Sequence, residues 1–252
     1  MTLRFACSSL TWPHEELERN LALLAPSGYE GWETREPLDL LGPPRRLLRL
    51  CADAGIEIAA VTGPNATRST ADPAHQICKR RIEYAADLGV GLFMTKGPGH
   101  GEVSPSPDTE FDGIAAVYED LAEHGDRLGV SVTWHPHENH FVDSAGEWRR
   151  FMPRLKTCRL CLDVMHAVLW GCDPAEAARE FAGRIAYVHL HGRKGKEPAD
   201  LDDGPLCDYG RFLSALEGEL GFSGWVVVLP GGRRPAEESI RRNRGYLRGL
   251  GY

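Results

Sequence analysis

Short runs of β-branched and aromatic residues recur along the chain, and longer stretches with apolar residues three or four positions apart lie between them. Strands buried on both faces of a parallel sheet have this near-continuous apolar character. Eight such runs are predicted strands: Phe5–Ser8, Gly31–Thr34, Ile56–Val61, Leu92–Thr95, Val130–Trp134, Leu160–Asp163, Ile185–His189 and Trp225–Leu229. Helices are predicted between them, for example over Pro13–Ala25, Pro73–Leu88 and Thr109–Leu128.

Residues typical of helix ends support this division of the chain. Pro73 and Pro174 stand where helices are expected to begin, a position that needs no backbone N–H. Ser144 and Glu147 have the spacing of a capping box. Glycines that are expected to end helices in the left-handed conformation precede several strands: Gly28, Gly55, Gly89, Gly129 and Gly221.

Eight repeats in 252 residues give about 31 residues for each strand and helix, which is the size of one βα unit. Parallel strands need crossover helices, and eight of them close into a barrel. The hydrophobic content of 42% and the charged content of 26% are those of a globular protein, without a break in composition. The sequence therefore predicts an α/β fold, a (β/α)8 TIM barrel, as a single domain over residues 1–252.

The charge balance and the cysteines narrow the function classes. Lys and Arg total 29 against 36 Asp and Glu, a net charge of −7, which argues against a dedicated nucleic-acid binder. No apolar run approaches the ~18 residues of a membrane span, and the N-terminus does not resemble a signal peptide, so we expect a cytoplasmic protein with no membrane partner. Cys158 and Cys161 have C-x-x-C spacing, but we interpret them as buried strand residues.

Reactive side chains gather at the predicted carboxyl ends of the strands, where barrel enzymes carry their chemistry. Strand alternation should turn His135 into the barrel, and likewise Asp163 and His189 on the next two strands. Two imidazoles and a carboxylate suit Mn²⁺, Fe²⁺, Zn²⁺ or Co²⁺, so these three are the predicted metal ligands. Each could instead be a hydrogen-bonded structural residue, and Asp163 could cap the next helix.

Several neighbouring residues are candidates for catalysis or for substrate binding. The predicted proton-transfer residues are Glu33, Lys96, His137 and Glu138. Lys96 could lose solvent at the barrel mouth and have a lowered pKa, although it could equally bind an anion or lie on the surface. The basic segment 191–196 includes His191 and Arg193 and could hold a phosphate or carboxylate, or be a mobile loop. Because no P-loop or dinucleotide fingerprint is present, we expect no nucleotide cofactor.

Three phrases of the chain resemble the xylose isomerase-like TIM-barrel superfamily: Gly28–Glu33, Leu162–His166 and Gly183–Leu190. Within it the chain is most similar to the sugar phosphate isomerase/epimerase group, and His135–His140 resembles its inosose dehydratase-like branch. The resemblance implies an isomerase, epimerase or dehydratase that acts on a small-molecule polyol or keto sugar. It also implies a divalent metal ion and a possible homo-oligomer.

The resemblance assigns roles residue by residue. Asp163 and His189 match two of the family's metal ligands, His166 resembles a substrate-binding histidine, and Glu33 resembles a glutamate that lines the pocket. His135 and Leu229 stand where relatives have metal-binding glutamates. The family's two-glutamate proton transfer is therefore not expected, whereas a three-ligand site with open positions would suit Lewis-acid catalysis. A metal-free enzyme, a non-catalytic sugar-binding protein and an Fe(II)-dependent oxygenase using the same ligands remain as alternatives.

Overall fold

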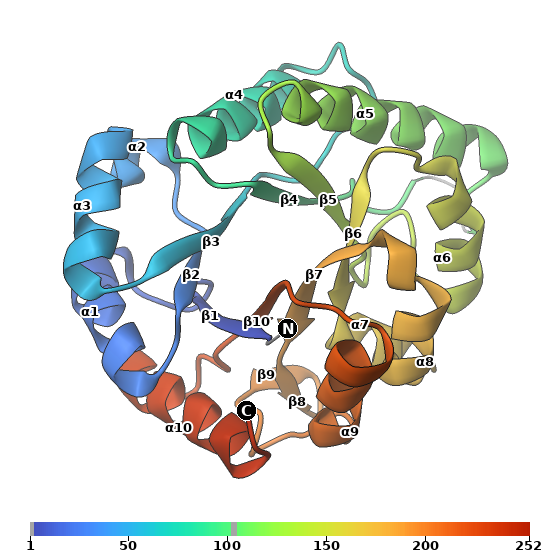
Figure 1. The fold of residues 1–252 in the computed structure, drawn as a ribbon. Coiled ribbons are helices and arrows are strands. Elements are labelled where there is room, and N and C mark those ends of the chain that lie inside the picture. The colour runs from blue at the N-terminus through green and yellow to red at the C-terminus, as the bar shows by residue number, and fades with distance from the viewer. Residues whose placement is uncertain (1–2, 102–104) are drawn as a thin grey trace.

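Eight parallel strands close into a barrel in the computed structural model, which describes residues 3–101 and 105–252 as a single domain (Figure 1). Around the barrel the strands follow the order β1, β10, β7, β6, β5, β4, β3 and β2. Their bounds are β1 Arg4–Ser8, β2 Gly31–Thr34, β3 Glu57–Thr62, β4 Leu92–Lys96, β5 Ser131–His135, β6 Arg159–Asp163, β7 Ile185–Leu190 and β10 Trp225–Val228. The predicted TIM barrel is confirmed, and each strand lies within a residue or so of its predicted position.

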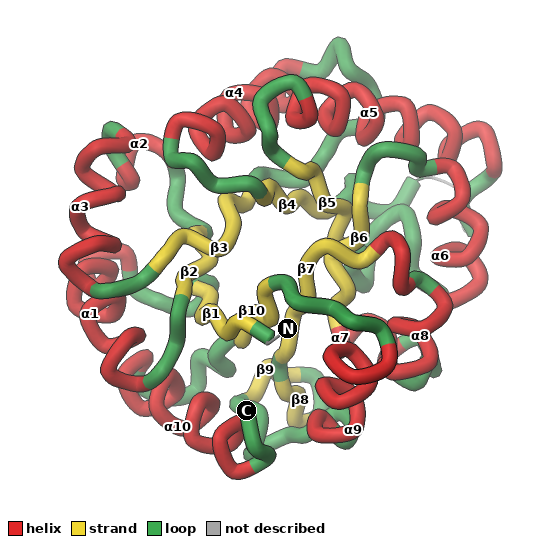
Figure 2. The backbone as a smooth tube through the Cα atoms, in the orientation of Figure 1, coloured by secondary structure: helices red, strands yellow, loops and turns green. Residues whose placement is uncertain are grey.

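Helices form a ring outside the strands (Figure 2). They are α1 Leu17–Ser27, α2 Leu38–Leu41, α3 Pro44–Ala54, α4 Pro73–Asp87, α5 Asp108–Asp126, α6 Ala145–Phe151, α7 Val164–Leu169, α8 Pro174–Glu180, α9 Tyr209–Ser214 and α10 Ala236–Gly249. The helix predicted to begin at Pro13 is divided, because a 3-10 turn over His14–Glu16 precedes α1. Within the described part of the chain, no helix has the length and apolar character needed to cross a membrane.

The helix ends follow the sequence signals. The Ser144 hydroxyl accepts a hydrogen bond from the Glu147 N–H at 3.2 Å, which confirms the predicted cap of α6. All five glycines expected in the left-handed conformation have positive φ angles, between 62° and 94°. The segment 191–196 differs from the predicted loop, since it enters an antiparallel hairpin of β8 Gly192–Lys194 and β9 Glu197–Ala199.

Two apolar layers lie on the two sides of the barrel wall. Val132 and Trp134 of β5 pack between strands and helices, as the alternation predicted, whereas Met94 of β4 belongs to the layer inside the barrel. Cys158 belongs to the outer layer and Cys161 to the inner one, and both are free thiols. Because they face opposite sides of the same segment, they cannot act together as a C-x-x-C metal site.

The inner apolar layer ends below the carboxyl ends of the strands. Leu229 follows β10 directly, belongs to this layer and is only 3% exposed. Its N–H donates to the Leu190 carbonyl at 2.8 Å, which continues the pairing of β10 with β7. The position where the family resemblance implies a glutamate is therefore occupied by a packed leucine, and the polar side chains of the mouth come from the other strands.

Two glycines of α5 provide a test of how tightly the helix ring packs. A Cβ on Gly125 would lie 2.3 Å from the Val130 carbonyl oxygen, whereas a Cβ on Gly113 would have no neighbour within 4 Å. We expect Gly113→Ala to raise the free energy of unfolding by roughly 0.5–1 kcal/mol through helix propensity. Gly125→Ala should lower it by about 1–3 kcal/mol through overpacking. Urea unfolding of both variants checks this, and equal effects would contradict the packing described here.

Candidate active site

Asp163 combines a structural role with a position at the barrel mouth. It ends β6 and caps α7, since its Oδ1 accepts hydrogen bonds from the N–H groups of Met165 at 2.8 Å and His166 at 3.2 Å. The register of β6 and β7 places Asp163 beside His189. Capping fixes the carboxylate so that Oδ2 faces the neighbouring histidines. The capping role that the sequence left open therefore coexists with a place in the site.

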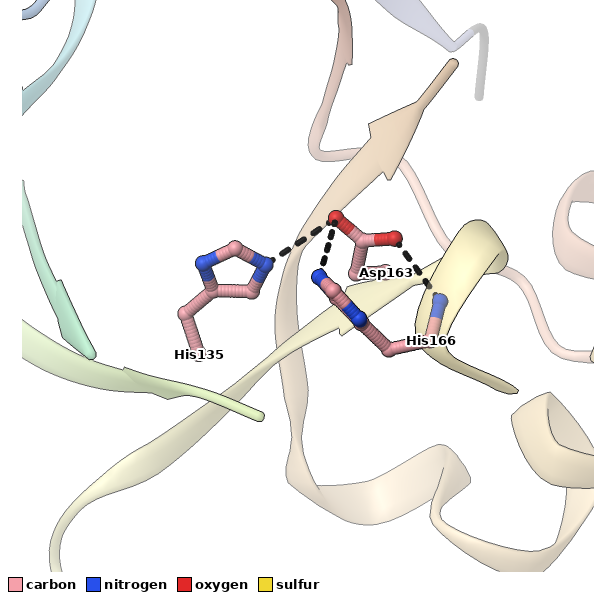
Figure 3. Close-up of side chains that lie close together, drawn as sticks. All are labelled: His135, Asp163 and His166. Carbon is pink, nitrogen blue, oxygen red and sulfur yellow. Dashed lines mark hydrogen bonds and ion pairs between the residues drawn. The ribbon is translucent and has the colours of Figure 1, made fainter. Parts of the chain in front are cut away.

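Four imidazoles surround Oδ2 of Asp163. The Nε2 atoms of His191 and His135 lie 2.9 Å and 3.0 Å from it, Nδ1 of His189 lies 3.5 Å away, and Nε2 of His166 lies 4.0 Å away. All five side chains are buried. Figure 3 shows the side chains of His135 and His166 directed toward this carboxylate. The structure thus brings together the three predicted metal ligands and two of the predicted substrate-binding residues.

Glu33 anchors the opposite side of this cluster. Its Oε1 accepts hydrogen bonds from the Ser8 hydroxyl at 2.7 Å and from Arg35 Nε at 2.6 Å. Its Oε2 accepts one from the Tyr187 hydroxyl and contacts His189 Nε2 at 2.7 Å. Burial alone would raise the pKa of Glu33, but the Arg35 charge and the His189 contact outweigh it and hold that pKa well below its usual range. With both oxygens doubly engaged, Glu33 is a poor proton acceptor and a good positioning group.

His189 lies between two buried carboxylates. Its Nε2 contacts Glu33, while its Nδ1 faces Asp163. Burial opposes a positive charge on the ring, but Cys161, Glu33 and the contact with Asp163 raise its pKa well above the usual value. The pKa of Asp163 is lowered, because His191 and the other surrounding histidines outweigh the effect of burial. In the metal-free protein the charges of His189 and Arg35 together therefore balance the two carboxylates.

Two further buried histidines, His135 and His166, are neutral near pH 7. Burial lowers the pKa of His135 well below its usual value and that of His166 to about 3. The N–H of Glu138 donates to Nδ1 of His166 at 3.1 Å, so the hydrogen of this ring must be on Nε2. In the described part of the chain, that Nε2, Nδ1 of His135 and Nδ1 of His189 are buried without a hydrogen-bond partner. Since buried polar atoms are nearly always paired, these nitrogens indicate that a ligand binds at this cluster.

The donor set fits a divalent metal ion. His135, Asp163 and His166 each offer a ligand atom within 4.8 Å of the others, and imidazole with carboxylate suits several first-row metals. The hydrogen on Nε2 makes His166 a donor rather than a ligand in this arrangement. His189 offers Nδ1 instead, and its contact with Glu33 is the outer carboxylate contact that orients many metal-binding histidines. On this reasoning His135, Asp163 and His189 stay the predicted ligand set, with His166 as a hydrogen-bond donor beside them.

Lys96 and His137 lie at the rim of this site. Lys96 ends β4 in register with His135, and burial together with the Arg35 charge lowers its pKa, as the sequence predicted. The His137 ring lies 4.3 Å from that of His166, measured between ring centroids. Its Nδ1 contacts the Glu138 carbonyl at 2.8 Å, and burial lowers its pKa to about 4. His137 is therefore neutral at pH 7, with the Nε2 lone pair available.

The hairpin of β8 and β9 contacts the loop after β5. Nη1 of Arg193 in β8 pairs with Oε1 of Glu138 at 3.1 Å, which joins the hairpin to that loop. The Tyr209 hydroxyl donates to the His191 carbonyl at 2.9 Å and fixes the start of the hairpin. Arg193 thus already pairs with a carboxylate of the protein, and its role in substrate binding stays a prediction.

The sequence did not identify three residues of the Glu33 network. Ser8 ends β1 in register with Glu33, and Arg35 follows Glu33 at the spacing of one strand face. For both positions, the alternation of side chains along a strand could have predicted a side chain on the same face as Glu33. Tyr187 precedes His189 by two residues on the inward face of β7. Its contact with Glu33 joins opposite sides of the barrel, and such a contact is visible only in three dimensions.

Comparison with known proteins agrees with this architecture. The family model described as xylose isomerase-like TIM barrel matches residues 21–250. The chain belongs to this family. It is 29% identical to an inosose dehydratase of Geobacillus kaustophilus over 128 residues, which are 49% of this chain. The match spans 41% of the length of that relative.

Solved structures of low sequence identity share the fold. A sugar phosphate isomerase/epimerase from Parabacteroides distasonis superposes with a TM-score of 0.79 at 19% identity, covering 98% of this chain and 94% of that one. An L-ribulose 3-epimerase gives 0.81 at 22% identity, covering 99% and 94%. A probable 3-DHS dehydratase from Bacillus anthracis gives 0.78 at 12% identity, covering 98% and 99%. The family resemblance predicted from sequence is confirmed.

The contact between Tyr187 and Glu33 can be tested by removing one hydroxyl. Tyr187→Phe should lower the free energy of unfolding at pH 7 by about 1.5–3 kcal/mol, because a buried charged carboxylate loses a donor. Tyr118→Phe is the matched control, since the Tyr118 hydroxyl is buried without a partner and its loss should cost nothing. Urea unfolding measures both. Equal values would contradict the proposed role of the Tyr187 hydroxyl.

The lowered pKa of His137 predicts a pH dependence of stability. The unfolded chain takes up a proton at His137 below pH ~6.5, whereas the folded protein does so only near pH 4. The stability due to its neutral form is therefore complete above pH ~6.5 and is lost as the pH falls toward 4. In chelator-treated protein, His137→Asn should flatten the dependence of the unfolding free energy on pH in this window. An unchanged slope would show that His137 is solvated.

Proposed function

We propose that this protein is an enzyme that removes a proton from the carbon next to the carbonyl of a polyhydroxylated keto compound, such as a keto sugar or a cyclitol. The single observation that carries this proposal is the group of buried imidazole nitrogens without partners around Asp163. They form a polar, water-poor site at the end of the barrel where chemistry is placed in this fold. The relatives named inosose dehydratase and L-ribulose 3-epimerase support the substrate class and a reaction among isomerisation, epimerisation and dehydration.

The proposal includes a divalent metal ion held by His135, Asp163 and His189. When bound, such an ion supplies Lewis-acid polarisation of the substrate carbonyl. Leu229 leaves the β10 end of the barrel without a ligand. Glu33 positions His189 through Nε2, so that Nδ1 is directed to the interior.

Two groups are the proposed proton acceptors. Glu138 uses Oε1 to pair with Arg193, and no hydrogen bond engages its Oε2 within the described chain. His137 offers Nε2, because its Nδ1–H donates to a backbone carbonyl. His166 presents Nε2–H to the same interior and is placed to donate to a substrate oxygen. Glu33 is assigned to positioning and not to proton transfer.

A metal-free enzyme is the second candidate. The positive charges of His189 and Arg35 already balance Glu33 and Asp163, so the buried charges are compensated without an ion. In that case the acid and base groups act alone, with His166 and the His189 imidazolium stabilising the charge that develops on the substrate oxygen. The two candidates differ in whether the protein binds one divalent ion per chain.

Metal titration separates these candidates. We expect calorimetry on chelator-treated protein to show binding of one Mn²⁺, Zn²⁺, Co²⁺ or Fe²⁺ ion per chain, weakened about 100-fold or more by Asp163→Asn. Asp173→Asn is the matched control, because Asp173 also caps a helix but lies at α8, outside the site. If none of the four ions binds, the metal-dependent proposal is wrong and the metal-free enzyme remains.

Proton removal can be tested before the product is known. Incubation with L-ribulose or an inosose in D₂O should place deuterium on the carbon next to the carbonyl, measured by NMR. Glu138→Gln together with His137→Asn should slow this exchange by about 10²-fold or more. Glu180→Gln, an exposed change on α8, is the control and should retain the wild-type rate. Absence of exchange across a panel of keto sugars and cyclitols would contradict the proposed function. Uptake of O₂ with Fe²⁺ would instead identify an oxygenase.

A further inference from the structure

Two cationic side chains face the barrel mouth from strands on the side opposite the hairpin. Leu92 and Met94 of β4 pack with the apolar layer inside the barrel, so alternation also directs Lys96 inward, at the level of His135. Arg35 follows Glu33 by two residues and donates to it through Nε. Both cations therefore lie in the layer directly above the apolar interior, beside the four-histidine cluster.

Neither cation is fully partnered. Among the described residues, no hydrogen bond engages the buried Nη2 of Arg35. Lys96 is half-buried, and in the described ranges 3–101 and 105–252 its ammonium makes no ion pair within 4.0 Å. Arg35 pairs with Glu33 through Nε at 2.6 Å, and Glu33 also contacts His189. Lys96 is therefore a cation without a paired carboxylate at this point of the mouth, and Nη2 of Arg35 is a donor without an acceptor beside it.

The surroundings add further positive potential. The Arg35 charge acts on Lys96, and the Lys96 charge acts in turn on His137 and His140. Strand β3 lies between β2 and β4, and it contributes the small side chains of Ala59 and Ala60 to the interior of the barrel. Holding like charges close together in a partly desolvated site is unfavourable unless an anion joins them.

We infer that the substrate carries an oxyanion, a carboxylate or a phosphate, that binds between the Lys96 ammonium and Nη2 of Arg35. This inference rests on the proposed function for the identity of the reacting group, and it narrows the substrate to an acidic or phosphorylated keto compound. The anion fixes one end of the substrate on the β2–β4 side, while Asp163 and its histidines meet the other polar groups. Arg193, which the sequence suggested for this purpose, is already paired with Glu138, and we therefore place the anion at Lys96 and Arg35.

The test uses the full chain and two small probes without a keto group, inorganic phosphate and glycolate, in calorimetric titrations at constant ionic strength. We expect one saturable site per chain for at least one probe. Lys96→Met should weaken binding about tenfold or more, because a charge-assisted contact is lost. Lys96→Arg should retain binding within a few-fold of the wild type. Lys196→Met, which removes the same charge from an exposed position between β8 and β9, is the matched control and should bind as the wild type does.

The two probes distinguish the two kinds of anion. Binding of phosphate but not glycolate assigns a phosphorylated substrate, and the reverse assigns a carboxylate. The inference is overturned if neither probe binds, or if Lys96→Met binds as tightly as Lys196→Met. Loss of an unpaired, partly desolvated charge should leave the midpoint of thermal unfolding unchanged or raise it, so the variant remains a folded protein. Because the probes cannot react, anion binding without deuterium exchange would refute the proposed function alone, and exchange without anion binding would refute this inference alone.

Discussion

The site depends on the buried carboxylate of Asp163, which the fold keeps ionised and fixed. One oxygen caps α7 through two backbone N–H groups, and the other faces four imidazole nitrogens. A buried carboxylate requires such partners, because burial without compensation would protonate it. The histidines are therefore held by the same interaction that keeps the carboxylate charged. Their arrangement is a property of the folded scaffold and does not require a substrate.

His189 links this carboxylate to a second one, Glu33, across the barrel. The Glu33 network ties together strands that are distant in sequence, since Ser8 comes from β1 and Tyr187 from β7. His189 is consequently positioned by residues of several strands, with Glu33 on β2 and Asp163 on β6. Leu229 follows β10 with a buried apolar side chain, so this strand adds no polar side chain there.

Most of the fold could be predicted from the sequence, and the reason is physical. Barrel strands are buried on both faces, so each appears as a short apolar run, and the glycines and prolines at helix ends mark the boundaries. Alternation within β5, β6 and β7 also placed His135, Asp163 and His189 on the inward face. By contrast, the hydrogen on His166 depends on a backbone N–H of Glu138, and the engagement of Arg193 depends on a hairpin that the sequence pattern did not indicate. Tertiary contacts between loops decide both, and local periodicity carries no information about them.

The charge distribution around Asp163 also determines what the site can bind. On one side, ring nitrogens of His135, His166 and His189 make no hydrogen bond within the described chain, and on the other side lie the Lys96 ammonium and Nη2 of Arg35. The substrate that we propose is polar along its length and anionic at one end, so that its two ends meet these two parts of the site.

The most direct test of this account is nitrogen NMR of the histidine rings in chelator-treated protein at pH 7. The account predicts that His189 is charged on both nitrogens, whereas His135 and His166 are neutral with their hydrogen on Nε2. Tyr187→Phe should change the His189 signals more than those of the other rings. If His189 instead titrates as a free histidine near pH 6.5, the bridge between Glu33 and Asp163 does not exist and the account is wrong.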